Sequence, residues 1–555
     1  MEIPSYNSLI QRSVQKHWDL DALSDYGVET FKYKDVAVIV ARLHLLYDRI
    51  GIKPGDKIAL CGRNMSRWGA AYVSILTYGA VAVPILNEFH PSQVHDIVNH
   101  SDARLLFVGD KVWNKLSADN MPQLEMIISL NDYSVLVVRP EQNLSVFTEV
   151  DKLYAEKYPD GLKPEDIRYY QDQPDELALI NYTSGTTSNS KGVMLPYRAL
   201  WSNVDFAENA MGSYFTPADH VLSMLPMAHM YGLTFELMYE FIKGLHIHFL
   251  TKIASPTILM KALADVKPMV LIMVPLILEK VVRKSVFPRI QNPRMRLLMK
   301  TPIIGRIIKR RICHALTDAL GGRFYQVIVG GAALNQEVEQ LLKDIGFRYT
   351  IGYGATECAP IICYEDYSKL VPGSCGKPVI HMELKVMSDD PRHVPGEILA
   401  RGLNVMLGYY KNPEETAKTL DAEGWYHTGD LGIMDKDGNL YIKGRSKNML
   451  LGANGQNIYP EEIEDKLANM NLVQECVVIQ KEDKLYGLVY PDYDQIKAQG
   501  LSQEALEQIM EENRKNLNAS IPSYAQICGI RLMETEFEKT PKKSIKRYLY
   551  ANAEV

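Results

Sequence analysis

Residues 182–192 read Tyr-Thr-Ser-Gly-Thr-Thr-Ser-Asn-Ser-Lys-Gly, a short stretch that joins hydroxyl side chains, two glycines and one lysine. An apolar run at 177–182 leads into it and is typical of a buried strand. Hydroxyls and unhindered backbone N–H groups suit the oxygens of a polyphosphate, and Lys191 adds a mobile positive charge. The stretch is not a Walker A loop, because the GxxxxGKS/T pattern is absent. Taken alone, such a stretch is more often an ordinary loop than a phosphate site.

The same succession of strand and loop recurs on both sides of this stretch. The spacing of apolar residues predicts helices over 34–50 and 68–83, with a short buried strand over 57–61 between them. Strands are also predicted at 325–329 and 348–351, and each leads into a loop that contains glycine. Alternating strands and helices indicate a parallel sheet, and ligands gather at the carboxyl ends of its strands.

The pattern changes after about residue 365. Short strands with glycine-rich connections are predicted at 383–386, 396–401 and 440–443, which favours a smaller β subdomain. Beyond Arg445 the pattern predicts further elements, namely helices at 461–468 and 502–516 and a strand at 476–480.

A chain of 555 residues is also too long for one hydrophobic core. We therefore expect an α/β fold with a large N-terminal domain (1–444), made of parallel-sheet α/β subdomains plus a β subdomain. A hinge at 445–447 would join it to a small mobile α+β C-terminal domain (448–555).

Composition restricts the class of protein. Hydrophobic residues at 46% and charged residues at 23% describe a soluble globular chain rather than a disordered one. The seven cysteines form no CxxC pair, and their odd number favours a reducing compartment. Neither a signal-peptide core nor a spanning run of apolar residues is present. We expect a cytoplasmic protein, with peripheral contact to the inner face of the membrane left open.

Positive charge is concentrated at 280–311, where eleven lysines and arginines occur without an aspartate or glutamate, although the whole chain carries a net charge of -6. Such an excess attracts phosphates, anionic lipid or nucleic acid, or it is simply a solvated helical face. Because Phe287 is the only aromatic residue among the basic ones, we expect no nucleic-acid binding.

Two more motifs follow predicted strands. Residues 329–334 (Val-Gly-Gly-Ala-Ala-Leu) contain adjacent glycines that let a flat ligand approach the backbone, although a plain turn would use them equally. Residues 352–357 read Gly-Tyr-Gly-Ala-Thr-Glu. Here Tyr353 could stack on a base, Thr356 could hydrogen-bond a phosphate, and Glu357 could hold Mg²⁺.

A fourth motif, Gly-Trp-Tyr-His-Thr-Gly-Asp at 424–430, is followed by Gly-Arg-Ser-Lys at 444–447. An aspartate after a tight turn suits the two vicinal hydroxyls of a ribose, because one carboxylate accepts both hydrogen bonds. Arg445 could contact the same hydroxyls as a donor to their oxygens.

In this order, the motifs resemble the superfamily of adenylate-forming enzymes, which comprises acyl-CoA synthetases, peptide-synthetase adenylation domains and luciferases. The resemblance extends from about residue 25 to 548. Residues 225–232 (Leu-Pro-Met-Ala-His-Met-Tyr-Gly) are similar to the family's LPxxHxxG segment, and residues 444–464 resemble its hinge and thioester loop.

The resemblance implies an enzyme that uses ATP and Mg²⁺ to convert a carboxylic acid into an acyl-AMP, with coenzyme A as the acceptor. The catalytic residues that it implies are Lys191, His229, Thr356, Glu357 and Lys543. The nucleotide-binding residues that it implies are Thr183, Ser184, Gly185, Thr186, Thr187, Gly331, Ala332, Tyr353, Gly354, Asp430, Arg445 and Lys447. Thr183 and Glu357 would lie at the metal.

The chain departs from the family pattern in two places. The usual phosphate loop reads SGTTGxPKG, whereas Ser188 and Ser190 here replace the glycine and the proline. The family's C-terminal signature KTPxGKIxR is represented by Lys-Thr-Pro-Lys-Lys-Ser-Ile-Lys-Arg at 539–547, which places Ser544 at the position of the catalytic lysine. We expect Lys543 to substitute for it, with Lys542 and Lys546 as alternatives.

Residues 274–280 (Val-Pro-Leu-Ile-Leu-Glu-Lys) look like the VPxxxEK segment of long- and medium-chain fatty acyl-CoA synthetases, so we expect a fatty acid as substrate. The basic stretch that follows would suit a membrane surface or the phosphates of CoA. One alternative is a stand-alone adenylation enzyme that loads a carrier protein. Phe235 and Glu236 argue against it, since an amino-acid site commonly has an aspartate there. The other alternative, suggested by Ser544, is an impaired nucleotide-binding relative. The oligomeric state stays open.

Overall fold

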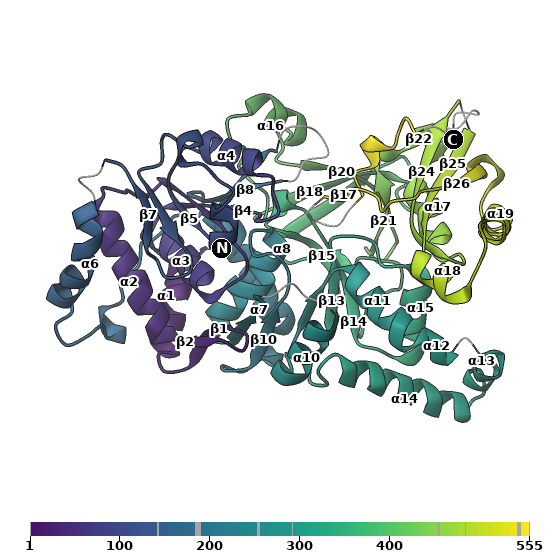
Figure 1. The fold of residues 1–555 in the computed structure, drawn as a ribbon, viewed down its shortest axis with the longest axis horizontal. Helices are drawn as coiled ribbons and strands as arrows, with labels where there is room; N and C mark the ends of the chain where they lie inside the picture. The colour runs from purple at the N-terminus through teal and green to yellow at the C-terminus, as the bar shows by residue number, and fades with distance from the viewer. Residues whose placement is uncertain are drawn as a thin grey trace.

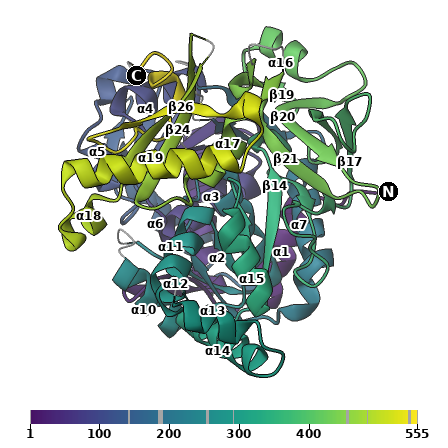
Figure 2. The same cartoon turned by 90° about the vertical axis from the view of Figure 1, so that its right-hand side faces the viewer.

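The structure is a computed structural model that describes residues 2–553 except 141–143, 184–189, 252–255, 291, 452–455, 483 and 541–544. Side chains are also left undescribed at 144–148, 256, 289, 293 and 296. Figures 1 and 2 show a large N-terminal part and a smaller C-terminal part that packs beside it. In the described part of the chain, no helix is both long and apolar enough to cross a bilayer.

The largest sheet has eight strands in the order β19-β9-β8-β4-β3-β5-β6-β7. Its inner strands run parallel, and β9, β7 and β19 are antiparallel to their neighbours. The strands are β3 (Lys57–Cys61), β4 (Val81–Ile85), β5 (Ala103–Val108), β6 (Met126–Ser129), β7 (Val135–Val138), β8 (Leu177–Tyr182), β9 (Gly192–Pro196) and β19 (Gly408–Tyr409). The helices of this region are α1 (Tyr6–Lys16), α2 (Tyr33–Arg49), α3 (Ser66–Tyr78), α4 (Pro91–His100), α5 (Asp110–Trp113), α6 (Leu144–Lys157) and α7 (Tyr197–Met211).

One predicted helix was too long. The sequence pattern placed residues 68–83 in a single helix, but α3 ends at Tyr78, and strand β4 begins at Val81. Gly79 ends the helix in a left-handed conformation (φ 85°), and its N–H hydrogen-bonds back into the last turn. An unbroken apolar run does not distinguish a buried helix from a buried strand, so the boundary could be found only from the glycine.

A second sheet has the order β12-β13-β14-β15-β16, and its first three strands are parallel. The strands are β12 (Leu271–Met273), β13 (Val327–Gly330), β14 (Tyr349–Gly354), β15 (Ile361–Tyr364) and β16 (Lys377–Pro378). Its helices are α10 (Pro256–Val266), α11 (Pro275–Ser285), α12 (Phe287–Ile290), α13 (Pro293–Met299), α14 (Ile304–Ala319) and α15 (Gln336–Ile345).

A small third sheet, with the order β10-β11-β1-β2, lies low in Figure 1, away from α16. It contains β1 (Asp21–Asp25), β2 (Glu29–Lys32), β10 (His220–Ser223) and β11 (His246–Phe249). Strands β10, β11 and β1 are parallel, and β2 returns antiparallel to β1. The helices between β10 and β11 are α8 (Met230–Leu233) and α9 (Tyr239–Lys243).

The predicted β subdomain is present as an antiparallel sheet in the order β17-β18-β20-β21. Its elements are β17 (Met382–Met387), β18 (Gly396–Gly402), β20 (Tyr426–Met434), β21 (Leu440–Arg445) and helix α16 (Pro413–Thr419).

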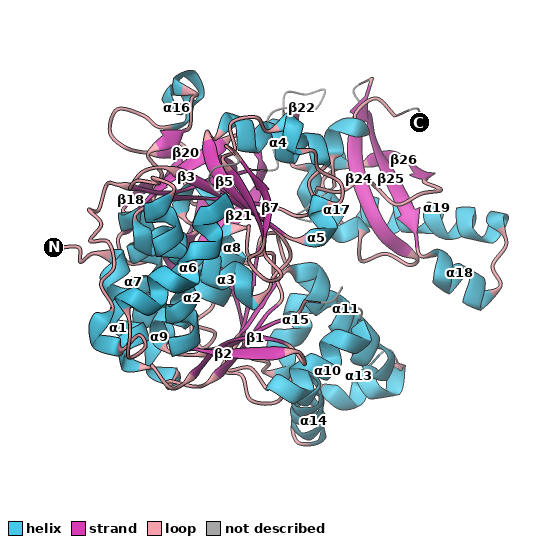
Figure 3. Cartoon of the chain, turned by 60° about the vertical axis from the view of Figure 1, so that its left-hand side comes forward, coloured by secondary structure: helices cyan, strands magenta, loops and turns pink. Residues whose placement is uncertain are grey.

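The C-terminal part has its own hydrophobic core, which includes Leu467, Val489 and Leu517. Its elements, shown in magenta and cyan in Figure 3, are β22 (Leu450–Leu451), β23 (Asn457–Ile458), α17 (Pro460–Leu467), β24 (Val473–Lys481), β25 (Lys484–Pro491), α18 (Tyr493–Gln499), α19 (Gln503–Ala519) and β26 (Ile527–Leu532). The predicted α/β fold, with parallel-sheet subdomains, a β subdomain and an α+β C-terminal part, is confirmed.

Candidate functional site

The candidate phosphate loop joins β8 to β9, which pair antiparallel, so the predicted strand before the loop is correct and a second strand follows it. The Thr183 N–H donates to the Lys191 carbonyl at 3.0 Å and closes the base of the loop. Four predicted contact residues (Ser184, Gly185, Thr186 and Thr187) and Ser188 lie outside the described residues.

Lys191 at the end of this loop is held in place by α16. Its ammonium forms an ion pair with Glu415 and lies 5.1 Å from the centroid of the Tyr409 ring. The hydrogen bond and charge of Lys191 hold the pKa of Glu415 below its usual value, and the charge of Lys447 acts in the same direction. Lys447 thus lies within electrostatic range of the same carboxylate.

Tyr409 connects the phosphate loop to the Gly-Tyr-Gly-Ala-Thr-Glu motif. Its backbone pairs with Val193 of β9, and its hydroxyl donates to Glu357 Oε1 at 2.9 Å. The Tyr409 side chain therefore lies against the ammonium of Lys191 with its ring and contacts the carboxylate of Glu357 with its hydroxyl. Sequence reasoning missed both Tyr409 and Glu415, because each acts across more than fifty residues of chain.

The turn after β14 fixes Thr356 and Glu357. The Ala355 N–H donates to the Pro360 carbonyl at 2.9 Å, and the Glu357 carbonyl accepts from the Met406 N–H at 2.9 Å. A Cβ at Gly354 would lie 2.2 Å from the Pro360 oxygen, so only glycine fits there. Thr356 is buried in this turn.

Tyr353, Asp430 and Arg445 come together as a cluster. The Tyr353 hydroxyl donates to Asp430 Oδ2 at 2.7 Å, and Arg445 Nε lies 3.0 Å from Asp430 Oδ1. Asp430 and Arg445 are direct cross-strand partners on β20 and β21, which explains their contact. Burial raises the pKa of Asp430, and the charge of Arg445 opposes that shift. The Glu357 carboxylate also raises it, so this cluster and Glu357 share one electrostatic environment.

His229 lies between the ends of β8 and β13. Asn181 of β8 donates to the Ala228 carbonyl at 2.9 Å, and the Tyr231 hydroxyl donates to the Ile328 carbonyl of β13 at 3.2 Å. His229 itself caps helix α8, where its Nδ1 accepts from the Tyr231 N–H at 3.2 Å.

Glu236, which the sequence places where an amino-acid-binding site commonly has an aspartate, turns its carboxylate toward the backbone. It is fully buried and accepts from the N–H groups of Met224 and Leu225 at 2.9 and 2.8 Å. Burial raises its pKa well above the usual range. Glu236 therefore holds the start of the segment that carries His229.

Three further predicted residues, Gly331, Ala332 and Lys447, follow the ends of strands. Gly331 and Ala332 follow β13 and are exposed, and Gly331 has a φ of +87°. A Cβ built on Gly331 would meet only Val274 Cγ1, at 4.0 Å, so its backbone is open to a flat ligand. Lys447 is exposed in the 3-10 turn Ser446–Asn448, directly after β21.

These residues fit a nucleotide and a magnesium ion. Glu357 and Thr183 offer the oxygen donors that Mg²⁺ prefers, Lys191 offers a cation, and Asp430 offers a ribose acceptor. Lys543 and Ser544 lie outside the described residues, so the structure does not describe the substitute lysine.

The C-terminal part contacts the large part through α17 and the turn after it. The Arg283 guanidinium of α11 donates to Asn469 Oδ1 at 2.9 Å. The Asp465 carboxylate accepts from the Gln336 N–H at the start of α15 and lies near Glu279. Burial, with the charges of Glu279 and Glu339, raises the pKa of Asp465 to about 6.

Asp465→Asn should stabilise the protein at pH 8 and leave it nearly unchanged at pH 4. An acid with a raised folded-state pKa contributes stability while protonated and loses it as pH rises toward about 6. The neutral amide avoids that loss, so we expect a gain of about 1–3 kcal/mol at pH 8. Thermal melting at both pH values measures it, with the exposed Asp389→Asn as a control. An equal gain at both pH values would contradict the explanation.

The basic stretch forms α11 to α14 (Figure 2), and several apolar side chains beside it face solvent. Leu297 is 70% exposed and Ile303 is 75% exposed. A surface hollow of about 1020 Å³ lies against α14 and is lined by both basic and apolar residues, including Lys300, Arg306 and Ile290.

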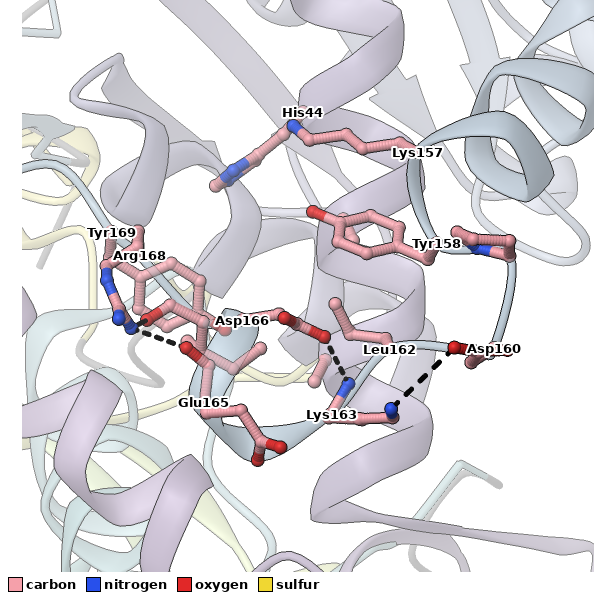
Figure 4. Close-up of a pocket in the computed structure, with 15 residues that line it drawn as sticks. His44, Lys157, Tyr158, Asp160, Leu162, Lys163, Glu165, Asp166, Arg168 and Tyr169 are labelled. Carbon is pink, nitrogen blue, oxygen red and sulfur yellow. Dashed lines mark hydrogen bonds and ion pairs between the residues drawn. The ribbon is translucent and has the colours of Figure 1, made fainter.

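A second hollow, of about 540 Å³, lies between α2 and residues 157–169 (Figure 4). Its polar groups pair within the loop: the Lys163 N–H donates to Asp166 at 2.9 Å, and Arg168 donates to the Glu165 carbonyl at 2.7 Å. Behind it, His44 Nε2 donates to the Ser74 carbonyl at 2.9 Å and lies 3.2 Å from Thr77 Oγ1. This hollow includes none of the predicted site residues.

The chain is similar to known proteins in sequence and in fold. Residues 10–410 match the family model described as AMP-binding enzyme, and residues 447–553 match that of the AMP-binding enzyme C-terminal domain. The peroxisomal long chain acyl-CoA synthetase 6 of Arabidopsis thaliana is 28% identical over 479 residues, which cover 82% of this chain and 67% of that protein.

Two further likenesses concern other acids. A Rhodococcus jostii ligase that joins CoA to a methyl-dioxo-octahydroindenyl propanoyl group is 29% identical over 502 residues, 87% of each chain. The anthranilate CoA ligase AuaEII, solved in complex with anthranoyl-AMP, superimposes with a TM-score of 0.79 at 20% identity over 100% of this chain and 98% of that one.

Proposed function

Because the chain belongs to the AMP-binding enzyme family, we propose that it is an ATP-dependent acid–CoA ligase whose acid is a long-chain fatty acid. It would form an acyl-AMP with release of pyrophosphate and then transfer the acyl group to CoA with release of AMP. The observation that carries the proposal is the convergence of Lys191, Glu357 and Asp430 around Tyr409 and Tyr353.

The first step brings a carboxylate to the α-phosphorus of ATP, so an anion must approach a polyanion. Lys191 would neutralise part of this charge, and Glu415 holds its ammonium in position beforehand. Mg²⁺, when bound by Glu357 and Thr183, would supply further charge neutralisation at the phosphates. His229 would contact the carboxylate of the acid.

The nucleotide would be held at its other end by the Tyr353 cluster. Asp430 and Arg445 would bind the ribose hydroxyls, Tyr353 would stack on adenine, and Thr356 would contact the phosphate of AMP. The backbone at Gly331, Ala332 and Gly354 would line the base. The phosphate loop, with Ser184, Gly185, Thr186 and Thr187, would bind the polyphosphate.

The domain arrangement belongs to this proposal. Residues 1–444 would form the acid- and nucleotide-binding domain, and residues 448–555 would rotate about Lys447 between the two steps. After rotation, residues 452–455 would line the path of the CoA thiol. Movements of this kind often limit turnover.

Lys543 would take the role of the lysine that the family has at the position of Ser544. Lys543→Ala should lower acyl-AMP formation roughly 10²-fold, because a cation that bridges acid and phosphate in the transition state is lost. Thioester formation from supplied acyl-AMP should not change. Lys542→Ala serves as the control, and an equal loss in both variants would argue against Lys543.

Two observations support a fatty acid. Relatives named long chain acyl-CoA synthetases cover most of the chain. The fatty acyl-type segment at 274–280 also anchors the end of the loop after β13, since Glu279 accepts from the Asn335 N–H at 3.0 Å. The Rhodococcus relative is named for a fused-ring acid, so an acid of that kind is the competing candidate for the substrate.

A panel of acids with ATP, Mg²⁺ and CoA tests the substrate directly. We expect AMP and thioester from medium- and long-chain fatty acids and little from aryl or fused-ring acids. Turnover of ring acids alone would overturn the fatty-acid proposal but retain the ligase. Pyrophosphate exchange driven only by amino acids would instead indicate carrier-protein loading, and ATP binding without acyl-AMP would indicate an impaired relative.

Peripheral membrane contact through 280–311 is part of the same proposal, since exposed isoleucines and basic residues share α14. Reversing three charges, with Arg306→Glu, Lys309→Glu and Arg310→Glu, should weaken cosedimentation with phosphatidylserine vesicles at least tenfold. The control reverses Lys53, Lys111 and Lys115. Equal binding to neutral vesicles, unaffected by the reversals, would exclude this contact.

A further inference from the structure

Three histidines converge on one face of the small sheet, away from the proposed nucleotide site. His220 begins β10, and His246 begins β11 as its direct Cα partner in the parallel pairing. His248 is two residues further along β11, and alternate residues of a strand point to the same face. The register alone therefore places the three rings side by side.

The ring geometry matches this register. The centroids of His220 and His246 are 5.1 Å apart, those of His220 and His248 5.1 Å, and those of His246 and His248 4.0 Å. His220 Nδ1 lies 2.9 Å from His248 Nε2. One nitrogen from each ring lies within 4.8 Å of the others.

We propose that His220, His246 and His248 form a binding site for a divalent transition-metal ion, with Zn²⁺ as the best match. Three imidazoles are a common ligand set for zinc, whereas Mg²⁺ and Ca²⁺ prefer oxygen. Zinc–nitrogen bonds of about 2.0–2.1 Å in tetrahedral geometry place two ligand nitrogens about 3.3 Å apart. The 2.9 Å between His220 Nδ1 and His248 Nε2 is close to that value, and the third ligand atom lies within 4.8 Å of both. Water would take the fourth position.

The second layer of contacts supports the site. Ser24 Oγ lies 2.6 Å from His246 Nε2 and 2.7 Å from Thr30 Oγ1. With the Nε2 proton donated to Ser24, His246 Nδ1 keeps its lone pair for the metal. Metal-binding histidines are commonly oriented in this way by a hydrogen bond from the second nitrogen.

The protonation states also suit a metal. Burial lowers the pKa of His246 to about 4 and that of His248 to about 3, and burial also lowers the pKa of His220. Burial thus disfavours the charged form of all three rings, and the neutral imidazole is the form that binds a metal. The nearby carboxylate of Asp21 raises the pKa of His220 and His248, so its charge also favours a bound cation. The charge of Arg323 lowers the pKa of His220 and so disfavours a cation. Arg323 is paired with Asp219 at 2.8 Å.

The ion would be structural. Strand β10 leads directly from His220 into the segment that carries His229, and Ser24 belongs to the N-terminal strand β1. A metal at this point would tie together β10 and β11 and, through Ser24, β1. The site is independent of the proposed ligase activity, so its failure and that of the ligase are distinguishable.

Metal-stripped full-length protein should bind one equivalent of Zn²⁺, and Co²⁺ in its place should show the visible absorption of a tetrahedral site. His248→Gln and His220→Gln should each weaken zinc binding at least tenfold. The exposed His314→Gln is the matched control and should bind normally. Unchanged zinc affinity in both cluster variants would overturn the proposal.

X-ray absorption at the zinc edge of the unmodified protein gives a test that does not depend on variants folding. It should show about three imidazole nitrogens at about 2.0–2.1 Å. A shell of sulfur, or of oxygen alone, would place the ion elsewhere and overturn the proposal. A rise of the melting temperature with Zn²⁺ in the unmodified chain, absent in His248→Gln, should accompany binding.

Discussion

Replacing Glu357 with glutamine should slow acyl-AMP formation roughly 10²–10³-fold, measured as pyrophosphate released from ATP and acid without CoA. Glutamine has the shape of glutamate and can still accept the Tyr409 hydrogen bond, so the turn after β14 should persist. It lacks the negative charge that would hold Mg²⁺ in the proposed site, so the magnesium concentration needed for half-maximal rate should rise.

Two further variants sharpen this prediction. Tyr409→Phe removes only the hydrogen bond to Glu357 and should cost less, on the order of tenfold. Glu423→Gln changes an exposed glutamate of the β subdomain, outside the turn that carries Glu357, and should have no effect. If Glu357→Gln released pyrophosphate at the normal rate with an unchanged magnesium requirement, Glu357 would not be a metal ligand.

Lys191→Met should lower acyl-AMP formation by about 10²-fold, because a cation facing the polyphosphate is removed. The change also removes the nearer of the two lysines paired with Glu415 and leaves only Lys418, at 4.0 Å, so the less neutralised carboxylate would repel ATP. The KM for ATP should therefore rise together with the fall in kcat. The pair Lys191→Met and Glu415→Gln should restore the KM but not the kcat, which separates repulsion from lost catalysis.

Lys418→Met is the matched control for Lys191. Lys418 lies on the same helix as Glu415 and pairs mainly with Glu414, at 2.7 Å. We expect a change of less than about twofold, as for an exposed ion pair. Equal losses of activity in Lys191→Met and Lys418→Met would mean that the rate depends only on the total positive charge near Glu415, and not on the position of Lys191.

The architecture followed from local patterns where each element had a distinct boundary. Short strands between glycine-rich connections were predicted at β17, β18 and β21, and helices were predicted at α2 and α19, all within a few residues. The pattern failed at residues 79–83, where an apolar helix and an apolar strand meet with only Gly79 and Ala80 between them.

Some residues of the proposed site could likewise be predicted from the sequence, and others could not. Asp430 and Arg445 could be named from short motifs, and the structure adds that they are cross-strand partners. Tyr409 and Glu415 could not be named, since an aromatic residue and a helical glutamate have many ordinary uses. Their contacts with Glu357 and Lys191 exist only once distant strands are paired. The three histidines were missed for the same reason, because their proximity depends on the register of β10 with β11.

Arg445, which contacts Asp430, is the last residue of β21, and the turn Ser446–Asn448 begins immediately after it. The Met449 N–H donates to the Arg445 carbonyl at 3.1 Å, so a single turn separates this strand from β22. Any coupling between ribose binding and reorientation of the C-terminal part would thus run through adjacent residues of one backbone. Such a link needs no relay of side chains through the interior, and its strength would depend on a few torsion angles rather than on a distributed network.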